Sequence, residues 1–156
     1  MDYKIICKTM IYLYRDLERK CNDVDDLMLR TAKASYNGDI FKIFDKMTSF
    51  IIEKNTYCNI KVIIDETIKE MDKSAELKLR YIIGLKNKDI ADKCNIGERT
   101  LYRHLETQIE DLSSRILNKY GELKLYDIIS NSKWLMNKYK LFLKEENELK
   151  APKGAK

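Results

Sequence analysis

The sequence has one histidine, one proline and five glycines, and its four cysteines are scattered without a CxxC pair. Structural zinc sites draw closely spaced ligands from cysteine and histidine, so this composition argues against one. Few glycines and prolines leave few helix breakers, which predicts long helices and disfavours a β-rich fold. Unpaired cysteines are typical of a reducing, cytoplasmic setting. We therefore expect neither a metal nor another cofactor.

Long apolar runs are also missing. No uninterrupted stretch approaches the ~20 residues of a membrane span, and Lys4, Lys8 and Arg15 interrupt the apolar pattern near the N-terminus, unlike a secretory signal. The chain has no glycine-rich phosphate loop, HExxH motif or recognisable nucleophile motif. We expect a cytoplasmic protein that is not an enzyme and has no membrane partner.

Apolar residues recur with helical spacing along most of the chain, which predicts an all-α helical bundle. A first helix is expected from Tyr3 to Lys20, followed by capping residues from Asn22 to Asp26 that would begin a second. Asn37-Gly38 is expected to be a turn, with Asp39 capping the next helix. Further boundaries are expected at Asn55 to Asn59, at Tyr120-Gly121 and at Ser132. Ser132 would cap a terminal amphipathic helix. The expected regions are residues 1–59 (N-terminal helices), 60–118 (helix-turn-helix), 119–149 (C-terminal helices) and 150–156 (disordered tail).

Two short helices joined by a tight turn are predicted between Leu77 and Leu112. Leu85 and Ile90 have the spacing of a hydrophobic staple at the start of one helix, and Ile96 and Leu101 repeat that spacing eleven residues later. Two staples fix two chain-entry angles, as a helix-turn-helix requires. The expected N-caps are Lys86, which lacks the side-chain acceptor of a good cap, and Gly97.

The same residues resemble a known family. The pattern LRY-x-x-GL-x-x-x-[DE]IA, followed by I-x-x-[RT]T-[LV], is similar to region 4 of bacterial sigma factors, and GL-x-NK-[DE]IA followed by T-[LV]-x-x-HL is similar to LuxR-type output domains. The matching positions are Leu79, Arg80, Tyr81, Gly84, Leu85, Asn87 to Ala91, Ile96, Thr100, Leu101, His104 and Leu105. The resemblance covers residues 68–117 and implies one superfamily of helix-turn-helix proteins, although Lys86 and Gly97 replace its usual Ser or Thr caps.

In that docking mode the second helix enters the major groove of double-stranded DNA. Arg99 and Arg103 are the candidates for guanine readout or phosphate clamping, and Glu98 for cytosine readout. The resemblance implies phosphate contact by Thr100, and Tyr102 has a hydroxyl that can donate to phosphate. Lys86, Asn87 and Lys88 open the first helix, where backbone amides favour phosphate. His104 is expected to be a half-buried packing residue.

Charge supports a nucleic-acid partner. Residues 1–72 carry a net charge of −1, residues 73–118 of +2 and residues 119–156 of +4. The positive balance therefore begins where the motif begins. This favours a nucleic-acid partner, because phosphate contacts supply most non-specific DNA affinity.

The sequence favours a DNA-binding transcriptional regulator, similar to small phage-encoded or bacterial regulators, that acts near a promoter. Two alternatives stay open: a sigma-like factor associated with RNA polymerase, and a helical interaction module that does not bind DNA. A homodimer is expected for a regulator that reads two half-sites, because one reader helix makes few base contacts.

Overall fold

The structure is a computed structural model that describes residues 2–34 and 38–150. These residues form helices and no strand, which confirms the all-α prediction. In chain order the elements are α1 (Tyr3–Tyr12), α2 (Tyr14–Ala34), α3 (Ile40–Glu70), α4 (Ala75–Leu77), the π-helical turn η2 (Lys78–Ile83), α5 (Asn87–Cys94), α6 (Glu98–Ser130) and α7 (Lys133–Lys150).

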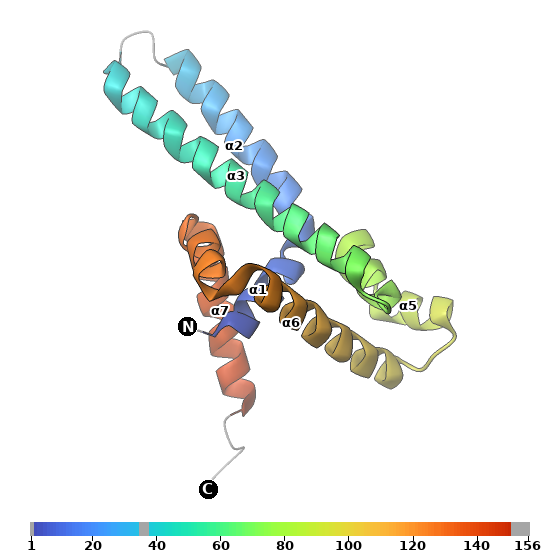
Figure 1. The fold of residues 1–156 in the computed structure, drawn as a ribbon. Coiled ribbons are helices and arrows are strands. Elements are labelled where there is room, and N and C mark those ends of the chain that lie inside the picture. The colour runs from blue at the N-terminus through green and yellow to red at the C-terminus, as the bar shows by residue number, and fades with distance from the viewer. Residues whose placement is uncertain (1, 35–37, 151–156) are drawn as a thin grey trace, which may run out of the picture.

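α2 and α3 form a long antiparallel hairpin that extends away from the rest of the molecule (Figure 1). Two predicted boundaries are wrong here, because α2 continues through Asn22–Asp26 and α3 continues through Asn55–Asn59. Asn and Asp have only modestly lower helix propensity, which packing between helices overrides. Lys54 Nζ, one residue before the second stretch, lies 2.6 Å from Asp25 Oδ1 in the first and joins the two helices, and Tyr57 is completely buried.

Other boundaries agree with the sequence. Asp39 caps α3 by accepting a hydrogen bond from the Phe41 amide, and Ser132 Oγ accepts one from the Leu135 amide at the start of α7. Gly121 interrupts α6 with φ 76° and ψ 165°. The first predicted helix is instead divided at Leu13, where ψ rises to −1°. The turn residue Asn37 and nearly all of the predicted disordered tail (residues 151–156) lie outside the described residues.

α1 is the centre of the packed body. Ile6, Met10 and Ile11 are fully buried, and the helix packs chiefly against α6 and also against α7 (Figure 1). Lys8 Nζ, 2.7 Å from Glu146 Oε1, links α1 to α7. Because the same core includes Ile90 of α5, Leu101 of α6 and Leu135 of α7, residues from all three predicted helical regions share it. The start of α6 is thereby anchored to the body.

Candidate nucleic-acid interface

α5 and α6 are joined by the three residues Asn95 to Gly97. Asn95 ends α5 in the left-handed conformation (φ 53°, ψ 46°), which asparagine tolerates better than most residues. Its amide donates to the Asp92 carbonyl, and the Ile96 amide donates to the Ala91 carbonyl at 3.0 Å. These bonds satisfy carbonyls at the end of α5 and reverse the chain within one short turn.

The N-terminus of each helix lies where the sequence indicates. Lys86 and Gly97 are the N-cap residues of α5 and α6, and neither supplies a side-chain capping bond. Both have extended backbone, with φ −71° and −72° respectively. Hydrophobic packing therefore replaces capping as the means of fixing these two ends.

That packing comes from one face of each helix. Ile90 and Ala91 of α5 are buried, as are Leu101 and Leu105 of α6. Leu85 and Ile96, which precede the two N-caps, are half-buried and pack against the same core. The small Ala91 side chain is only 3% exposed, so a larger side chain here would separate the helices from the core.

The opposite face of α6 begins with side chains open to solvent. Glu98, Arg99, Tyr102 and Arg103 are exposed, and Thr100 is half-buried. Within the described residues, the side chains of Arg99 and Arg103 have no hydrogen-bond or ion-pair partner. Two guanidinium groups without internal partners can bind an external acceptor without first breaking an ion pair.

At the start of α5 the predicted contact residues differ from one another. Lys86 and Lys88 are exposed. Asn87 is only half-buried, but its side-chain oxygen is buried and has no hydrogen-bond partner in the described part of the chain. The oxygen of Asn87 therefore faces the protein, and the two lysines are the free groups at this end.

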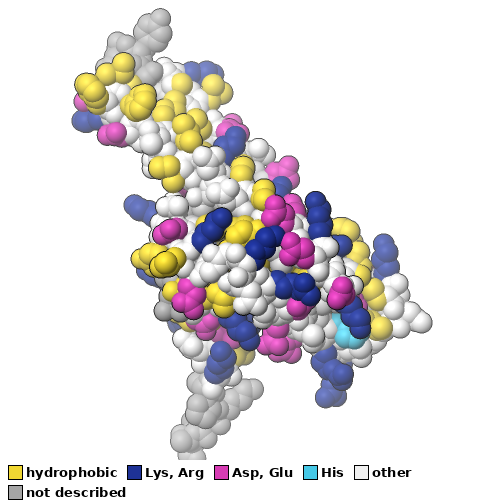
Figure 2. All heavy atoms as spheres, viewed as in Figure 1, with side chains coloured by type: hydrophobic (Ala, Val, Ile, Leu, Met, Phe, Trp, Pro, Cys, Tyr) yellow, Lys and Arg dark blue, Asp and Glu magenta, His cyan; other side chains and the backbone are white. Residues whose placement is uncertain are grey.

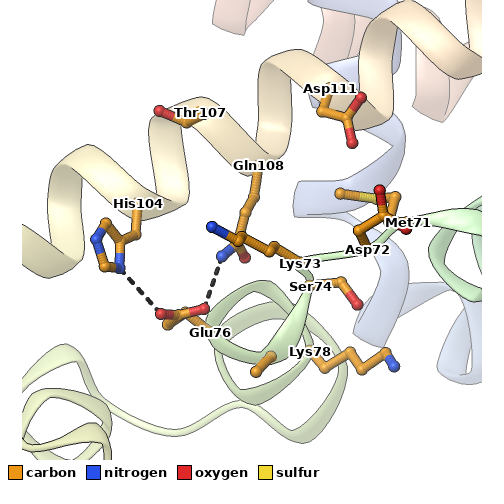
Figure 3. Close-up of a pocket in the computed structure, with 11 residues that line it drawn as sticks. Met71, Asp72, Lys73, Ser74, Glu76, Lys78, His104, Thr107, Gln108 and Asp111 are labelled. Carbon is orange, nitrogen blue, oxygen red and sulfur yellow. Dashed lines mark hydrogen bonds and ion pairs between the residues drawn. The ribbon is translucent and has the colours of Figure 1, made fainter.

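His104 does not have the packing role predicted from the sequence. Its side chain is 44% exposed, and Nδ1 lies 3.0 Å from Glu76 Oε1 (Figure 3). Gln108, one turn further along α6, donates from Nε2 to Glu76 Oε2 at 2.6 Å and accepts from the Leu77 amide at 3.0 Å. Because α4 supplies Glu76 as a polar partner, His104 faces Glu76 instead of the apolar core.

These three side chains lie in a groove of about 870 Å³ between residues 71–78 and α6 (Figure 3). Burial by itself would raise the pKa of Glu76, but hydrogen bonds from Gln108, the backbone and His104 outweigh burial and lower the pKa. Its carboxylate is held as an anion by groups of the protein itself. The hydrogen bonds across the groove thus hold α6 against the segment before α5.

A second depression, of about 400 Å³, is basic and was not found by sequence reasoning. Its lining residues are Tyr12, Arg15, Asp16, Arg19, Arg80 and Tyr81. The Arg15 guanidinium lies against Gly84, where an added Cβ would clash with Nη1. Gly84 is two residues before the cap of α5, so this depression adds positive charge beside the start of that helix. Arg15 and Arg19 are four residues apart, but no sequence pattern places Arg80 beside them.

The described residues contain no cluster of three or more His, Cys, Asp or Glu side chains able to hold a metal ion, and no helix with the length and apolarity needed to cross a bilayer. Burial raises the pKa of the Cys7 thiol to about 12. A thiol with that pKa is protonated at neutral pH and therefore a poor nucleophile.

Comparisons with known proteins leave the site to be interpreted from its own geometry. No protein-family model, no curated protein and no solved structure significantly matches this chain.

Proposed function

We propose that this protein binds double-stranded DNA in a sequence-specific manner and regulates transcription. The observation that carries the proposal is the start of α6, where Arg99 and Arg103 are exposed without internal partners while Leu101 and Leu105 anchor the same turns. A helix held firmly on one face and offering free guanidinium groups on the other suits insertion into a major groove.

Each exposed side chain has a defined task in this proposal. Arg99 and Arg103 donate to guanine O6 and N7 or clamp phosphates, while Glu98 accepts from cytosine N4. Tyr102 is 55% exposed, and its hydroxyl donates a hydrogen bond to a phosphate of the DNA backbone. Thr100 lies at the third position of α6, where its hydroxyl can contact a phosphate.

The start of α5 contacts the DNA backbone. Lys86 and Lys88 neutralise phosphates, and the unpaired amides of the first helical turn add partial positive charge. Arg15 and Arg80 extend this positive surface from the neighbouring depression. Such contacts fix the position of the protein on the duplex but carry little sequence information.

The test is a binding titration on a duplex selected from a random pool. Replacing Arg99 or Arg103 with alanine should weaken binding to that duplex by ~1 to 3 kcal/mol, the range for loss of a bidentate base contact. Arg30→Ala is the matched control, because it removes an exposed guanidinium from α2 in the projecting hairpin. The selected sequence also reports the mode of binding, since a palindrome indicates two symmetric readers.

Equal affinity of the wild type and both α6 arginine variants would refute the recognition surface. If the wild type showed no salt-dependent retention on random duplex, DNA binding itself would be refuted. The chain would then be an interaction module with a different partner.

A further inference from the structure

The outer half of the α2–α3 hairpin leaves a large apolar surface uncovered. α3 has 31 residues and is therefore about 46 Å long at 1.5 Å per residue. Apolar side chains gather at the free end of the hairpin, far from the packed body (Figure 2). Phe41 is 78% exposed and Phe44 is 72% exposed. These values are unusual for phenylalanine in a monomer.

Seven exposed side chains along α3 are spaced as in a heptad repeat. Alternating spacings of three and four residues connect Phe41, Phe44, Thr48, Ile51, Asn55, Cys58 and Val62, and every one of these is exposed. We call these seven residues the α3 seam. Residues between them, such as Phe50 and Tyr57, turn toward α2 and the body. A repeat of this kind is the contact line of a two-stranded coiled coil.

The seam has the area expected of a modest protein interface. If a fully exposed side chain of this size presents about 150 to 200 Å², the four large apolar seam residues with Ile40 and Ile52 expose roughly 600 Å². A standard interface buries ~800 Å² on each partner. The polar seam residues would add to the apolar part.

We propose that the α3 seam packs in parallel against the seam of a second copy of this chain. In a parallel pair, residues at the same heptad position face each other. Asn55 would then meet Asn55 of the partner subunit, and the two amides can hydrogen-bond. In an antiparallel pair Asn55 would face Phe44 or Ile51 of the partner subunit, with its amide unpaired in an apolar contact.

Charges beside the seam favour the same occupant. Lys54 and Lys61 flank it, but Lys54 is bound to Asp25 at 2.6 Å, and Lys61 lies over the ring of Tyr14 at 5.6 Å. Both cations are therefore held toward α2 of their own chain. Two identical seams meet without opposing lysines at these positions, and a second copy automatically supplies the partner for Asn55.

The first test measures the mass of the full chain by sedimentation equilibrium over a range of concentrations. The wild type should form dimers, and Phe44→Lys and Ile51→Lys should each shift it to monomer. Leu29→Lys is the matched control, because Leu29 is 57% exposed on the same hairpin but lies outside the seam. Thermal unfolding of each variant shows that the fold is retained. A monomeric wild type, or a dimer that both seam variants leave intact, would overturn the proposal.

The second test measures strand orientation with the native Cys58. Burial and the neighbouring Cys58 thiol raise the pKa of Cys21 to about 11. The two thiols are therefore neighbours, and Cys21 could form a disulfide with Cys58 in place of the disulfide between subunits. In the Cys21→Ser chain, mild oxidation should link Cys58 to Cys58 of the partner subunit, because a disulfide spans Cα atoms ~4.4 to 6.8 Å apart. Adding Cys58→Ser should abolish the linked dimer. A dimer without this cross-link would refute the parallel arrangement.

This inference does not rest on DNA binding, because both tests are carried out without DNA. If the seam variants stayed dimeric, the proposed role of the α6 arginines in DNA binding would be unaffected. If the α6 arginine variants bound DNA like the wild type, the proposed dimer would be unaffected. If both proposals are correct, the parallel pair places the two packed bodies at the same end of the coiled coil. Two α6 helices would then face a duplex together and read two half-sites.

Discussion

At the scale of single residues, a small hydrogen-bond network holds α6 in place. Glu76 accepts from Gln108 and pairs with His104, and Gln108 also accepts from the Leu77 amide. The Glu76 side chain is only 16% exposed, and a buried carboxylate is stable only when its oxygens are hydrogen-bonded. This hydrogen-bond network therefore couples the folding of α4 to the position of α6, within about one turn of Arg103.

Glu76→Gln should lower the free energy of unfolding by about 1 to 2 kcal/mol at neutral pH, because it removes charge-assisted hydrogen bonds. The pKa of Glu76 is lowered from its usual 4.5 in the folded protein. Its stabilisation is therefore complete above pH 4.5 and is lost as the pH falls through the lowered pKa. The difference between variant and wild type should shrink over that acidic range.

Denaturant unfolding at several pH values measures this difference. Glu122→Gln is the control, since Glu122 is exposed and has no partner within the described chain. A Glu76→Gln difference that stayed constant down to pH 3 would show that the carboxylate charge does not contribute.

At the scale of elements, the entry into α5 depends on a backbone conformation that few residues adopt. Gly84 has φ 87° and ψ 31°, and its amide and that of Leu85 both donate to the Leu79 carbonyl. This closes η2 and directs the chain toward Lys86. A left-handed residue at the end of a helix is commonly glycine, because glycine has no Cβ to clash.

Gly84→Ala should destabilise the protein by about 1 to 2 kcal/mol, the cost of placing an L-residue in the left-handed region. Its Cβ would also meet the Arg15 guanidinium, which can move aside because it is the end of a flexible side chain. Gly97→Ser is the informative contrast. Its backbone is extended and nothing lies within 4 Å of an added Cβ, so a capping hydroxyl should stabilise α6 by a few tenths of a kcal/mol.

Thermal or denaturant unfolding of both variants checks the pair. Equal stability of Gly84→Ala and the wild type would contradict the strain argument at Gly84. A destabilised Gly97→Ser would contradict the capping argument at the start of α6.

At the scale of the whole molecule, the exposed arginines of α6 and the exposed phenylalanines of α3 lie at different ends. The chain carries a net charge of +5. The packed body presents Arg99, Arg103 and the basic depression, while the far end of the hairpin presents the apolar seam. Such a separation suits a protein that contacts an anionic partner at one end and another protein at the other.

Salt dependence of DNA binding should report the basic surface. Each phosphate contact contributes about one to the slope of log K against log salt concentration. Lys88→Ala and Arg15→Ala should each reduce that slope by about one, and should weaken binding to all sequences alike. Lys33→Ala, which removes an exposed cation from the end of α2, should leave the slope unchanged. Unchanged slopes for Lys88→Ala and Arg15→Ala would remove these residues from the interface.

Local chemistry was sufficient to predict the helices and several of their ends. Asp39 and Ser132 act within three residues of their own position, and Gly121 breaks α6 by its own backbone freedom. The sequence could not show that α3 continues through Asn55, because packing between helices decided that point. Nor could its periodicity distinguish a buried stripe from an exposed one.

The sequence by itself determined the all-α class and where the described chain turns at Asn95 to Gly97, because these depend on periodicity and neighbouring residues. Only the tertiary structure decided that Arg80 lies beside Arg15 and Arg19, and that His104 meets Glu76. It also decided that Phe41 and Phe44 remain uncovered. Those outcomes depend on contacts between residues far apart in the chain, and no local pattern specifies which helix faces meet.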